Sequence, residues 1–234
     1  MHVRDIEYAV DGVALTGILA EPTGAAPAPG ILIAHEAPGV TEQVRERARR
    51  LAEAGYVAFA LDLYGERGLP LEQARAHAQR LMADAALMRR RARAALEVLA
   101  SQPKCDRGRL GAIGFCLGGI VALELARDAA PIRGAVGLHP GLKRPAGSAA
   151  GPISAKVLMM IGDADPIVPP EDRQRFTEEM SAAGADWQLL IFGGVGHSFT
   201  NPAVDALGFP GFAYDARADR RAWRTMLDLF QEIF

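Results

Sequence analysis

Short apolar runs alternate with longer amphipathic segments along most of the chain. Continuous apolar runs, typical of buried strands, occur at 31–34, 56–63, 109–115, 132–138, 156–161 and 187–192. Segments with apolar residues three or four positions apart predict helices at 41–54, 71–101, 117–127, 170–183 and 218–234. Strands that alternate with helices form a mostly parallel sheet covered on both faces. The pattern therefore predicts an α/β fold.

The amino-terminal residues follow a different pattern, in which polar and apolar residues alternate. Two such segments, 6–10 and 13–20, flank Asp11 and Gly12, a pair typical of a hairpin turn. These two strands bring the number of strands in the predicted sheet to about eight. We find no internal repeat and no linker between two cores, so we expect residues 1–234 to form a single domain.

The stretch around Cys116 carries the clearest chemical signal. Gly114 and Gly118 stand two residues before and after it, between a predicted strand and a predicted helix. This is the layout of a nucleophile elbow with cysteine in place of serine, in which larger flanking side chains would collide with the strand and the helix. The helix N-terminus favours a thiolate, and the N–H of Leu117 is suited to bind an oxyanion. We interpret Cys116 as a nucleophile.

A thiol nucleophile needs a base, and the base needs a carboxylate that orients it. In α/β-hydrolases the chain order is nucleophile, acid, histidine. His197 follows the last predicted strand in a glycine-rich turn, where the base is expected. Asp163 and Asp165 both follow the strand at 156–161. We favour Asp165, because Asp163 lies closer to the strand and can serve to cap the turn.

Other polar residues stand at the same predicted edge of the sheet. Glu36 and Ala37 follow the strand at 31–34: the Ala37 N–H is a candidate second oxyanion donor, and Glu36 is a candidate for poising the thiol. A solvated loop is the alternative for this pair. His139 ends the strand at 132–138 and either lines the pocket or has a structural role.

Two segments, 141–155 and 197–217, are long for plain connections, which often indicates function. The second contains aromatic residues that either cover a pocket or pack on the surface: Phe199, Phe209, Phe212 and Tyr214.

Composition and charge exclude several classes of function. The chain has 234 residues, of which 50% are hydrophobic, and a formal net charge of -2, so we expect no nucleic-acid or membrane partner. The opening residues do not resemble a signal peptide, and no apolar stretch approaches the roughly 20 residues of a membrane helix, which makes a cytoplasmic location the expectation. The sequence shows no metal-ligand cluster and no phosphate-binding loop, so we expect no cofactor.

Several stretches together resemble the dienelactone hydrolase family, the carboxymethylenebutenolidase-like members of the α/β-hydrolase superfamily. The resemblance runs nearly end to end and is carried by residues 29–36, 62–65, 111–119, 162–169 and 196–199, with Tyr214-Asp215 and Ala222-Trp223. It implies an α/β-hydrolase fold in which Cys116, Asp165 and His197 form the catalytic triad and Glu36 poises the thiol. It also implies a thiolate attack that forms an acyl-thioester, with small esters or enol lactones as substrates.

One departure from the family concerns the substrate. Family members that act on dienelactone carry arginines that bind the substrate carboxylate, one of them soon after the catalytic histidine, where this chain has Asn201. Arg67 and Arg75 are candidates for the other arginine. The resemblance therefore carries over the chemistry better than the substrate. Candidate substrate contacts are His139, Tyr64, Phe199 and Asn201.

Two other classes of function compete with a hydrolase. One is a non-catalytic ligand-binding or regulatory protein on a hydrolase scaffold, although elbow, acid and base all stand in the expected order. The other is a redox-active thiol at Cys116. Cys105, the other cysteine, precedes the predicted strand at 109–115 and is interpreted as an inert core residue. The sequence does not predict the oligomeric state.

Overall fold

The computed structural model describes residues 1–24, 26–149 and 151–234. Residues 25 and 150, the second of which falls within the long segment 141–155, lie outside the described residues. The elements follow one another as β1 (His2–Val10), β2 (Val13–Glu21), β3 (Ala28–Ala34), α1 (Glu42–Glu53), β4 (Val57–Ala60), α2 (Leu71–Ala83), α3 (Ala85–Ala100), β5 (Cys105–Phe115), α4 (Leu117–Arg127), β6 (Gly134–Leu138), β7 (Lys156–Gly162), α5 (Pro170–Ala182), β8 (Trp187–Phe192), the 3₁₀ helix η1 (Pro202–Leu207) and α6 (Ala216–Ile233).

The strands of the described residues form one eight-stranded sheet in the order β1-β2-β4-β3-β5-β6-β7-β8. The hairpin β1–β2 is antiparallel and joins the sheet antiparallel to β4, while every pair from β4 to β8 is parallel. Parallel neighbours require crossover connections, which the helices provide. The predicted α/β-hydrolase fold, with about eight strands and helices on both faces, is confirmed.

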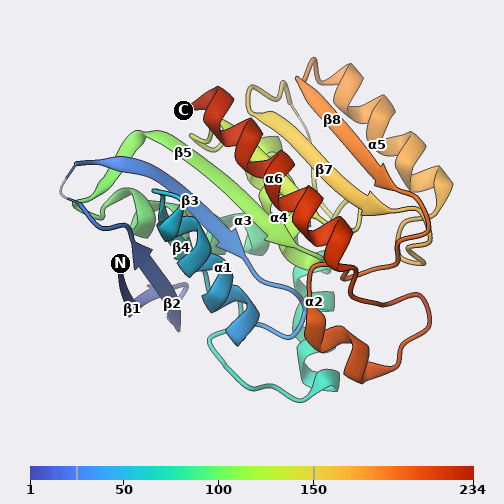
Figure 1. The fold of residues 1–234 in the computed structure, drawn as a ribbon, viewed down its shortest axis with the longest axis horizontal. Helices are drawn as coiled ribbons and strands as arrows, with labels where there is room; N and C mark the ends of the chain where they lie inside the picture. Colours follow the sequence, from blue (N-terminus) through green and yellow to red (C-terminus); the bar gives the residue numbers. More distant parts are fainter. Residues whose placement is uncertain (25, 150) are drawn as a thin grey trace.

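Helices cover the two faces of the sheet (Figure 1). On one face α1 and α6 pack over the central strands, and the apolar stripe of α1 is formed by Val44, Ala48 and Leu51. The other face is covered by α3, α4 and α5. Helix α4 is buried along its whole length, because it lies between the sheet and α3. Among the described residues, no helix combines the length and apolar character that crossing a membrane requires.

The structure changes some expected strand boundaries and adds local detail. Strand β5 begins at Cys105 rather than at 109, because Cys105 and Asp106 pair with Ala28 and Pro29 ahead of an irregularity in the register. Thr41 occupies the N-cap position of α1, but its side chain makes no capping hydrogen bond. The long segment after His197 contains η1.

Candidate active site

Cys116 lies in the turn between β5 and α4 with a φ of 51° and a ψ of -113°, a strained conformation for a residue with a side chain. The neighbouring glycines make this turn possible. A Cβ atom at Gly114 would lie 1.9 Å from the carbonyl oxygen of Gly118, and one at Gly118 would lie 2.1 Å from the carbonyl oxygen of Ala34. The steric reason inferred for the elbow glycines is therefore confirmed.

Asp165 and His197 come together across two loops at the carboxyl ends of β7 and β8. His197 Nδ1 lies 2.7 Å from Asp165 Oδ2, and both side chains are almost completely buried. Asp165 Oδ1 accepts a hydrogen bond of 2.8 Å from the N–H of Ile167, which fixes the carboxylate. Because a carboxylate accepts at Nδ1, that nitrogen carries the proton and leaves Nε2 as the basic atom in the neutral ring.

Asp163, the rival acid, has different neighbours. Its side chain is 58% exposed and its Oδ1 lies 3.3 Å from a guanidinium nitrogen of Arg173 on α5. The backbone carbonyl of Asp163 accepts a second bond, of 2.9 Å, from the same guanidinium. Asp163 therefore anchors the start of α5 and lies away from the histidine.

The environment of His197 favours its charged form. Burial lowers the pKa of the imidazole, but the negative charge of Cys116 and the hydrogen bond to Asp165 outweigh this and raise the pKa to about 10. His197 Nε2 is buried and has no hydrogen-bonding partner within the described residues. The charge of Cys116 thus acts on this ring, and Nε2 is the ring nitrogen that Asp165 does not occupy.

The backbone around His197 is held by close packing of glycines. A Cβ atom at Gly162 would lie 2.0 Å from the carbonyl oxygen of Val195, and one at Gly196 would lie 2.4 Å from that of Gly211. The N–H of His197 donates to the Gly211 carbonyl at 2.7 Å. The returning segment after η1 thus lies directly beside the histidine and limits its movement.

The two predicted oxyanion donors, the N–H groups of Leu117 and Ala37, belong to the segments that follow β5 and β3. Leu117 is the first residue of α4, where N–H groups have no partner within the helix. Ala37 lies in the loop after β3, and its carbonyl oxygen accepts a 3.0 Å hydrogen bond from the hydroxyl of Tyr64. Tyr64, predicted to contact substrate, is only 3% exposed and is tied to this loop. The contact at Gly118 brings the two donor segments together.

Glu36 is buried and faces the loop that follows His197. Its Oε2 accepts a 2.6 Å hydrogen bond from the Asn201 amide, and its Oε1 lies 3.6 Å from His139 Nε2. Burial raises the pKa of Glu36, although the Asn201 hydrogen bond and the charge of His197 act in the opposite direction. The amide of Asn201, which is predicted to contact substrate, donates to Glu36 and accepts from the N–H of Ala203.

His139 is completely buried behind the triad. Its Nε2 lies 2.8 Å from the hydroxyl oxygen of Thr200, and its ring lies edge-on to that of His197 with centroids 5.4 Å apart. Burial lowers the pKa of His139 well below its ordinary value, and the charges of His197 and Arg47 lower it further. Of the two roles predicted for His139, the structural one fits this placement.

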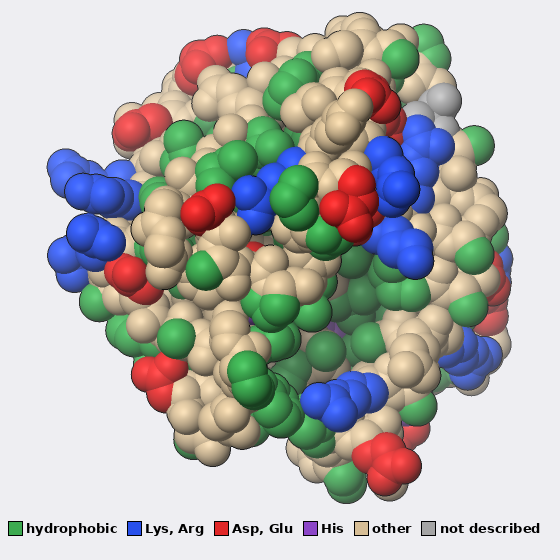
Figure 2. Space-filling model, turned by 90° about the vertical axis from the view of Figure 1, so that its right-hand side faces the viewer, with side chains coloured by type: hydrophobic (Ala, Val, Ile, Leu, Met, Phe, Trp, Pro, Cys, Tyr) green, Lys and Arg blue, Asp and Glu red, His purple; other side chains and the backbone are tan. Residues whose placement is uncertain are grey.

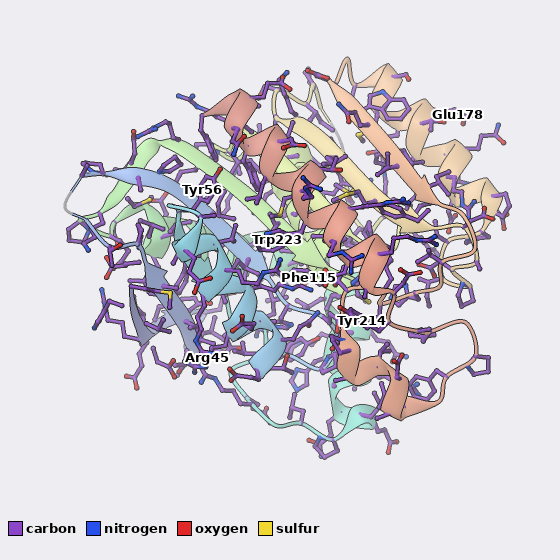
Figure 3. All side chains as sticks on the ribbon, in the orientation of Figure 1. Arg45, Tyr56, Phe115, Glu178, Tyr214 and Trp223 are labelled. Atoms are coloured by element: carbon purple, nitrogen blue, oxygen red, sulfur yellow. The ribbon has the colours of Figure 1, made fainter. Side chains whose placement is uncertain are left out.

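Arg47 is a site residue that sequence reasoning missed. It is buried between the rings of Phe115 and Trp223, both labelled in Figure 3, and donates to the Thr200 carbonyl at 2.7 Å and to Asp219 at 2.8 Å. It therefore supports the loop after His197 from α1. A signal was present in the sequence, because Arg47 falls on the apolar stripe of α1.

Of the four aromatic residues after His197, Phe212 packs directly on the histidine ring, and Phe209 packs on Phe212. The ring of Phe212 lies edge-on to that of His197 at 4.7 Å, and the ring of Phe209 follows at 5.8 Å from Phe212. Arg75 of α2 lies over Phe209 with its guanidinium carbon 5.3 Å from the ring centroid. Phe199, predicted to contact substrate, is completely buried against other aromatic rings and supports the loop from within.

Arg67, the other candidate for binding a substrate carboxylate, has partners elsewhere. It pairs with Asp5 at 2.9 Å and donates to the Thr16 carbonyl at 2.8 Å, which ties it to the amino-terminal hairpin. The exposed guanidinium of Arg75 is the one that lies beside the loop carrying His197.

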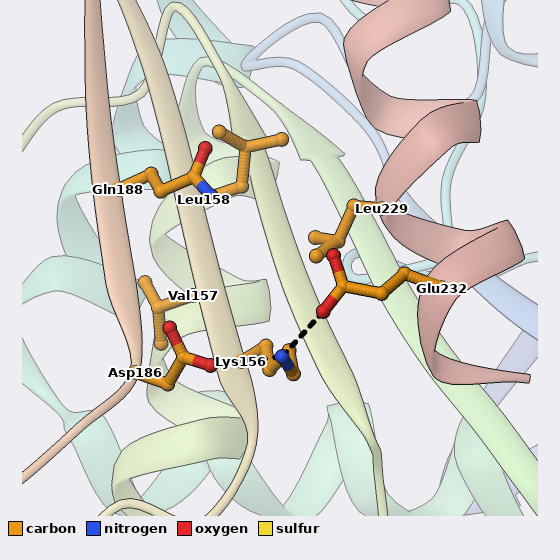
Figure 4. A pocket seen from close by; sticks show the side chains of 7 residues that line it. All are labelled: Lys156, Val157, Leu158, Asp186, Gln188, Leu229 and Glu232. Atoms are coloured by element: carbon orange, nitrogen blue, oxygen red, sulfur yellow. Dashed lines mark hydrogen bonds and ion pairs between the residues drawn. The ribbon is translucent and has the colours of Figure 1, made fainter.

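The two edges of the sheet differ in the hollows they carry. Figure 2 shows a hollow walled by hydrophobic side chains, with a histidine at its base and Lys and Arg side chains on its rim, on the side to which β7 and β8 point in Figure 1. A separate cavity of about 250 Å³ lies at the opposite edge, lined among others by Lys156, Asp186 and Glu232 (Figure 4). Its lysine is paired with both acids, and the residues that line it do not include Cys116, Asp165 or His197.

The fold and the buried Asp165–His197 pair beside the Cys116 elbow define a hydrolase of the α/β-hydrolase class. The sequence model of the dienelactone hydrolase family matches residues 15–234. The chain therefore belongs to the dienelactone hydrolase family, as its sequence motifs indicated.

Solved structures agree with this assignment. A dienelactone hydrolase-like promiscuous phosphotriesterase, P91, from metagenomic libraries is 38% identical with a TM-score of 0.95 and covers 100% of this chain and 98% of its own. A structure named m3DLH is 41% identical with the same TM-score of 0.95 and the same coverage of 100% and 98%.

Curated relatives include the "Uncharacterized protein K02A2.1" of Caenorhabditis elegans, 34% identical over 62% of this chain and 92% of the relative. A Bradyrhizobium protein named "Probable 2-oxo-3-(5-oxofuran-2-ylidene)propanoate lactonase" is 27% identical over 95% of this chain and 91% of the relative. Similarity to both relatives extends over nine-tenths of their length.

Proposed function

We propose that this hydrolase cleaves small carboxylic esters or enol lactones through a Cys116–His197–Asp165 triad. The observation that carries the proposal is the 2.7 Å contact between His197 Nδ1 and Asp165 Oδ2, which leaves Nε2 free on a ring whose pKa responds to Cys116. A thiol, a base and an orienting carboxylate are the three groups that nucleophilic acyl transfer requires.

The reaction follows from these groups. His197 Nε2 takes the thiol proton, and the thiolate attacks the carbonyl carbon while the N–H groups of Leu117 and Ala37 hold the oxyanion. The tetrahedral intermediate collapses to an acyl-thioester as the alkoxide or enolate leaves with the proton from His197. A water molecule, deprotonated by the same nitrogen, then attacks the thioester and releases the acid and the thiol.

Glu36 contributes a buried carboxyl group to this environment. We propose that it poises the thiol through charge: its Oε2 accepts the Asn201 hydrogen bond, and its Oε1 lies 3.6 Å from His139 Nε2 without a hydrogen bond. A negative charge there favours the imidazolium form of His197, and a protonated Glu36 removes that support.

One arginine beside the site supports a choice of substrate class. Arg75 lies over Phe209 beside the loop that carries His197, and an arginine there suits a substrate that carries a carboxylate. The Bradyrhizobium relative is named as the lactonase of such a compound. We therefore place carboxylate-bearing enol lactones first and neutral activated esters second.

The first experiment measures hydrolysis of p-nitrophenyl acetate by the wild type, Cys116→Ala and Cys105→Ala. We expect a loss on the order of 10⁴-fold or more for Cys116→Ala, while Cys105→Ala stays within about twofold. Rapid quenching should trap one acetyl group on Cys116 by mass spectrometry. Unchanged turnover by Cys116→Ala would overturn the triad, and saturable binding without turnover across an ester, lactone and thioester panel would favour the non-catalytic alternative.

Phosphotriester hydrolysis is a second candidate activity, favoured by the full-length similarity to a promiscuous phosphotriesterase at 38% identity. The thiolate would displace an aryloxide from phosphorus and water would cleave the resulting phosphorothioester. Release of p-nitrophenol from a p-nitrophenyl dialkyl phosphate by the wild type but not by Cys116→Ala is the expected result. Equal release by both proteins would show that the triad does not carry this activity.

A further inference from the structure

His35 is a buried histidine at the carboxyl end of β3 that the triad does not use. It is completely buried, and its ring lies edge-on to Tyr64 with centroids 4.8 Å apart. Its Nδ1 lies 2.6 Å from the carbonyl oxygen of Glu36, and its Nε2 lies 3.2 Å from the backbone nitrogen of Leu63. Both ring nitrogens are therefore paired with backbone groups.

These two partners fix the state of the ring. A carbonyl oxygen only accepts, so Nδ1 must carry a proton, and a backbone N–H only donates, so Nε2 must be unprotonated. The ring is neutral in one defined tautomer, and it bridges the loop after β3 and the loop after β4. A ring held in this way can fix the direction of the peptide group to which it donates.

The peptide group in question joins Glu36 to Ala37. The carbonyl of Glu36 and the N–H of Ala37 belong to the same planar unit, so a hydrogen bond to the carbonyl also sets the direction of the N–H. Resting on the proposed function, in which this N–H is the second oxyanion donor, we propose that His35 is a positioning residue that aligns the Ala37 N–H with the developing oxyanion.

Two further contacts hold the same short loop. The Glu36 carbonyl also accepts from the Gly39 N–H at 3.0 Å, and the Ala37 carbonyl accepts from the Tyr64 hydroxyl at 3.0 Å. Both carbonyls are therefore occupied, and within the described residues the Ala37 N–H has no intramolecular acceptor. Hydrogen bonds to a carbonyl polarise the peptide and strengthen its N–H as a donor. The restraint thus improves both the direction and the strength of the donor.

Two substitutions separate the bonds made by the ring. In asparagine the amide nitrogen stands at the same number of bonds from Cβ as Nδ1, so His35→Asn keeps a donor for the Glu36 carbonyl. In glutamine the amide group reaches the position of Nε2, so His35→Gln keeps an acceptor for the Leu63 N–H and loses the bond to Glu36. Tyr64→Phe removes only the hydroxyl on the Ala37 carbonyl.

Two reactions of Cys116 give the readout. Hydrolysis of p-nitrophenyl acetate passes through oxyanions in both acylation and deacylation, whereas alkylation by iodoacetamide forms none. We expect kcat to fall on the order of 10-fold to 10²-fold in His35→Gln with KM nearly unchanged, and to stay within about threefold in His35→Asn. Tyr64→Phe should lose less than His35→Gln. The alkylation rate should match the wild type in all three variants.

Each outcome has one meaning. An equal loss in His35→Asn and His35→Gln, or a wild-type kcat in His35→Gln, overturns the positioning role. A parallel fall in alkylation overturns it as well, because the change then acts on the thiol or the fold. If His35→Gln does not fold, Tyr64→Phe becomes the deciding variant. A lower kcat with an unchanged alkylation rate then supports the proposed positioning of the Ala37 N–H, and an unchanged kcat overturns it. Failure of the triad itself appears separately, as hydrolysis by Cys116→Ala.

Discussion

The two cysteines lie at opposite ends of one strand. Cys105 begins β5 at the amino edge of the sheet, 7% exposed, where a Cβ at Gly30 would come within 2.5 Å of its sulfur. Burial raises the pKa of Cys105 to about 11, with a smaller contribution from Asp106. Cys116 follows the other end of β5, at the N-terminus of α4, more exposed and beside His197.

This contrast shows that the surroundings of a cysteine depend on which end of the strand carries it. In a parallel sheet the carboxyl ends of the strands lead into loops that converge, and helix N-termini face the same space. That edge carries the Asp165–His197 pair and the turn of Cys116. At the other edge Cys105 meets only core packing, and Lys156 is neutralised by two acids.

The largest effect should come from the acid that orients His197. We expect Asp165→Asn to lower kcat/KM for p-nitrophenyl acetate on the order of 10³-fold to 10⁴-fold, because an amide cannot support the imidazolium or its tautomer. Asp163→Asn, two residues away, is the matched control and should stay within about twofold, since Asp163 only anchors Arg173. Comparable losses in the two variants would contradict the assignment of the acid.

The next effect compares the two cysteines directly. Native protein treated with iodoacetamide at pH 8 should be alkylated at Cys116, with Cys105 on the order of 10²-fold slower than an ordinary thiol because its pKa is about 11. Peptide mass spectrometry over time measures both rates in one sample. Unfolding in denaturant is the control and should equalise them. Rapid labelling of Cys105 in the folded protein would show that the two thiols do not differ in reactivity as their positions in the sheet predict.

Much of this arrangement is predictable from the chain because it depends on local rules. The glycines around Cys116 have a steric meaning that needs no tertiary structure, and the alternation of strands and helices places the three loops on one edge. The start of β5 was missed because Cys105 and Asp106 are drawn into the strand by pairing with β3, which no local pattern records.

Contacts that join distant segments could also not be predicted from the sequence. Nothing near Asn201 indicates that its amide binds Glu36, and nothing near Thr200 indicates that Arg47 supports it from α1. Tyr64 and Phe199 belong to stretches that resemble the family, and Asn201 stands where its dienelactone-specific members carry an arginine, so the sequence predicts all three as substrate contacts. In the structure their contacts hold the loops that carry the candidate donors and base.

A smaller effect on kcat/KM should distinguish Arg75, at the carboxyl ends of the strands, from Lys156 at the opposite edge of the sheet. Arg75→Gln should lower kcat/KM for a dienelactone, which carries a carboxylate, by about 5-fold to 10-fold, the size expected of one partly exposed charged hydrogen bond. Neutral p-nitrophenyl acetate should be hydrolysed at the wild-type rate. Lys156→Gln is the control at the opposite edge and should change neither substrate. A loss for both substrates in Arg75→Gln would mean that the arginine supports the loop through Phe209 rather than binding the carboxylate.

The smallest effect concerns how Glu36, a buried acid at the carboxyl ends of the strands, changes the stability of the protein with pH. Because burial raises the pKa of Glu36, the folded protein holds that proton more tightly than the unfolded chain. Raising the pH removes this proton from Glu36, and the buried carboxylate that remains is less stable than the protonated group. The free energy of unfolding of the wild type therefore falls relative to that of Glu36→Gln, which does not titrate at this position. We therefore expect the Tm of Glu36→Gln minus that of the wild type to be smallest near pH 4, around the ordinary glutamate value of about 4.3, and to increase towards pH 8.

Calorimetry across that range gives the difference, and Glu21→Gln, which removes one buried carboxyl group at the amino edge, controls for the loss of a negative charge. A difference that decreases as the pH rises would mean that the folded state prefers the Glu36 carboxylate. The Asn201 hydrogen bond and the charge of His197 would then outweigh burial. Glu36 would in that case supply a permanent negative charge to the imidazolium of His197, rather than one that is lost when the carboxyl group takes up a proton.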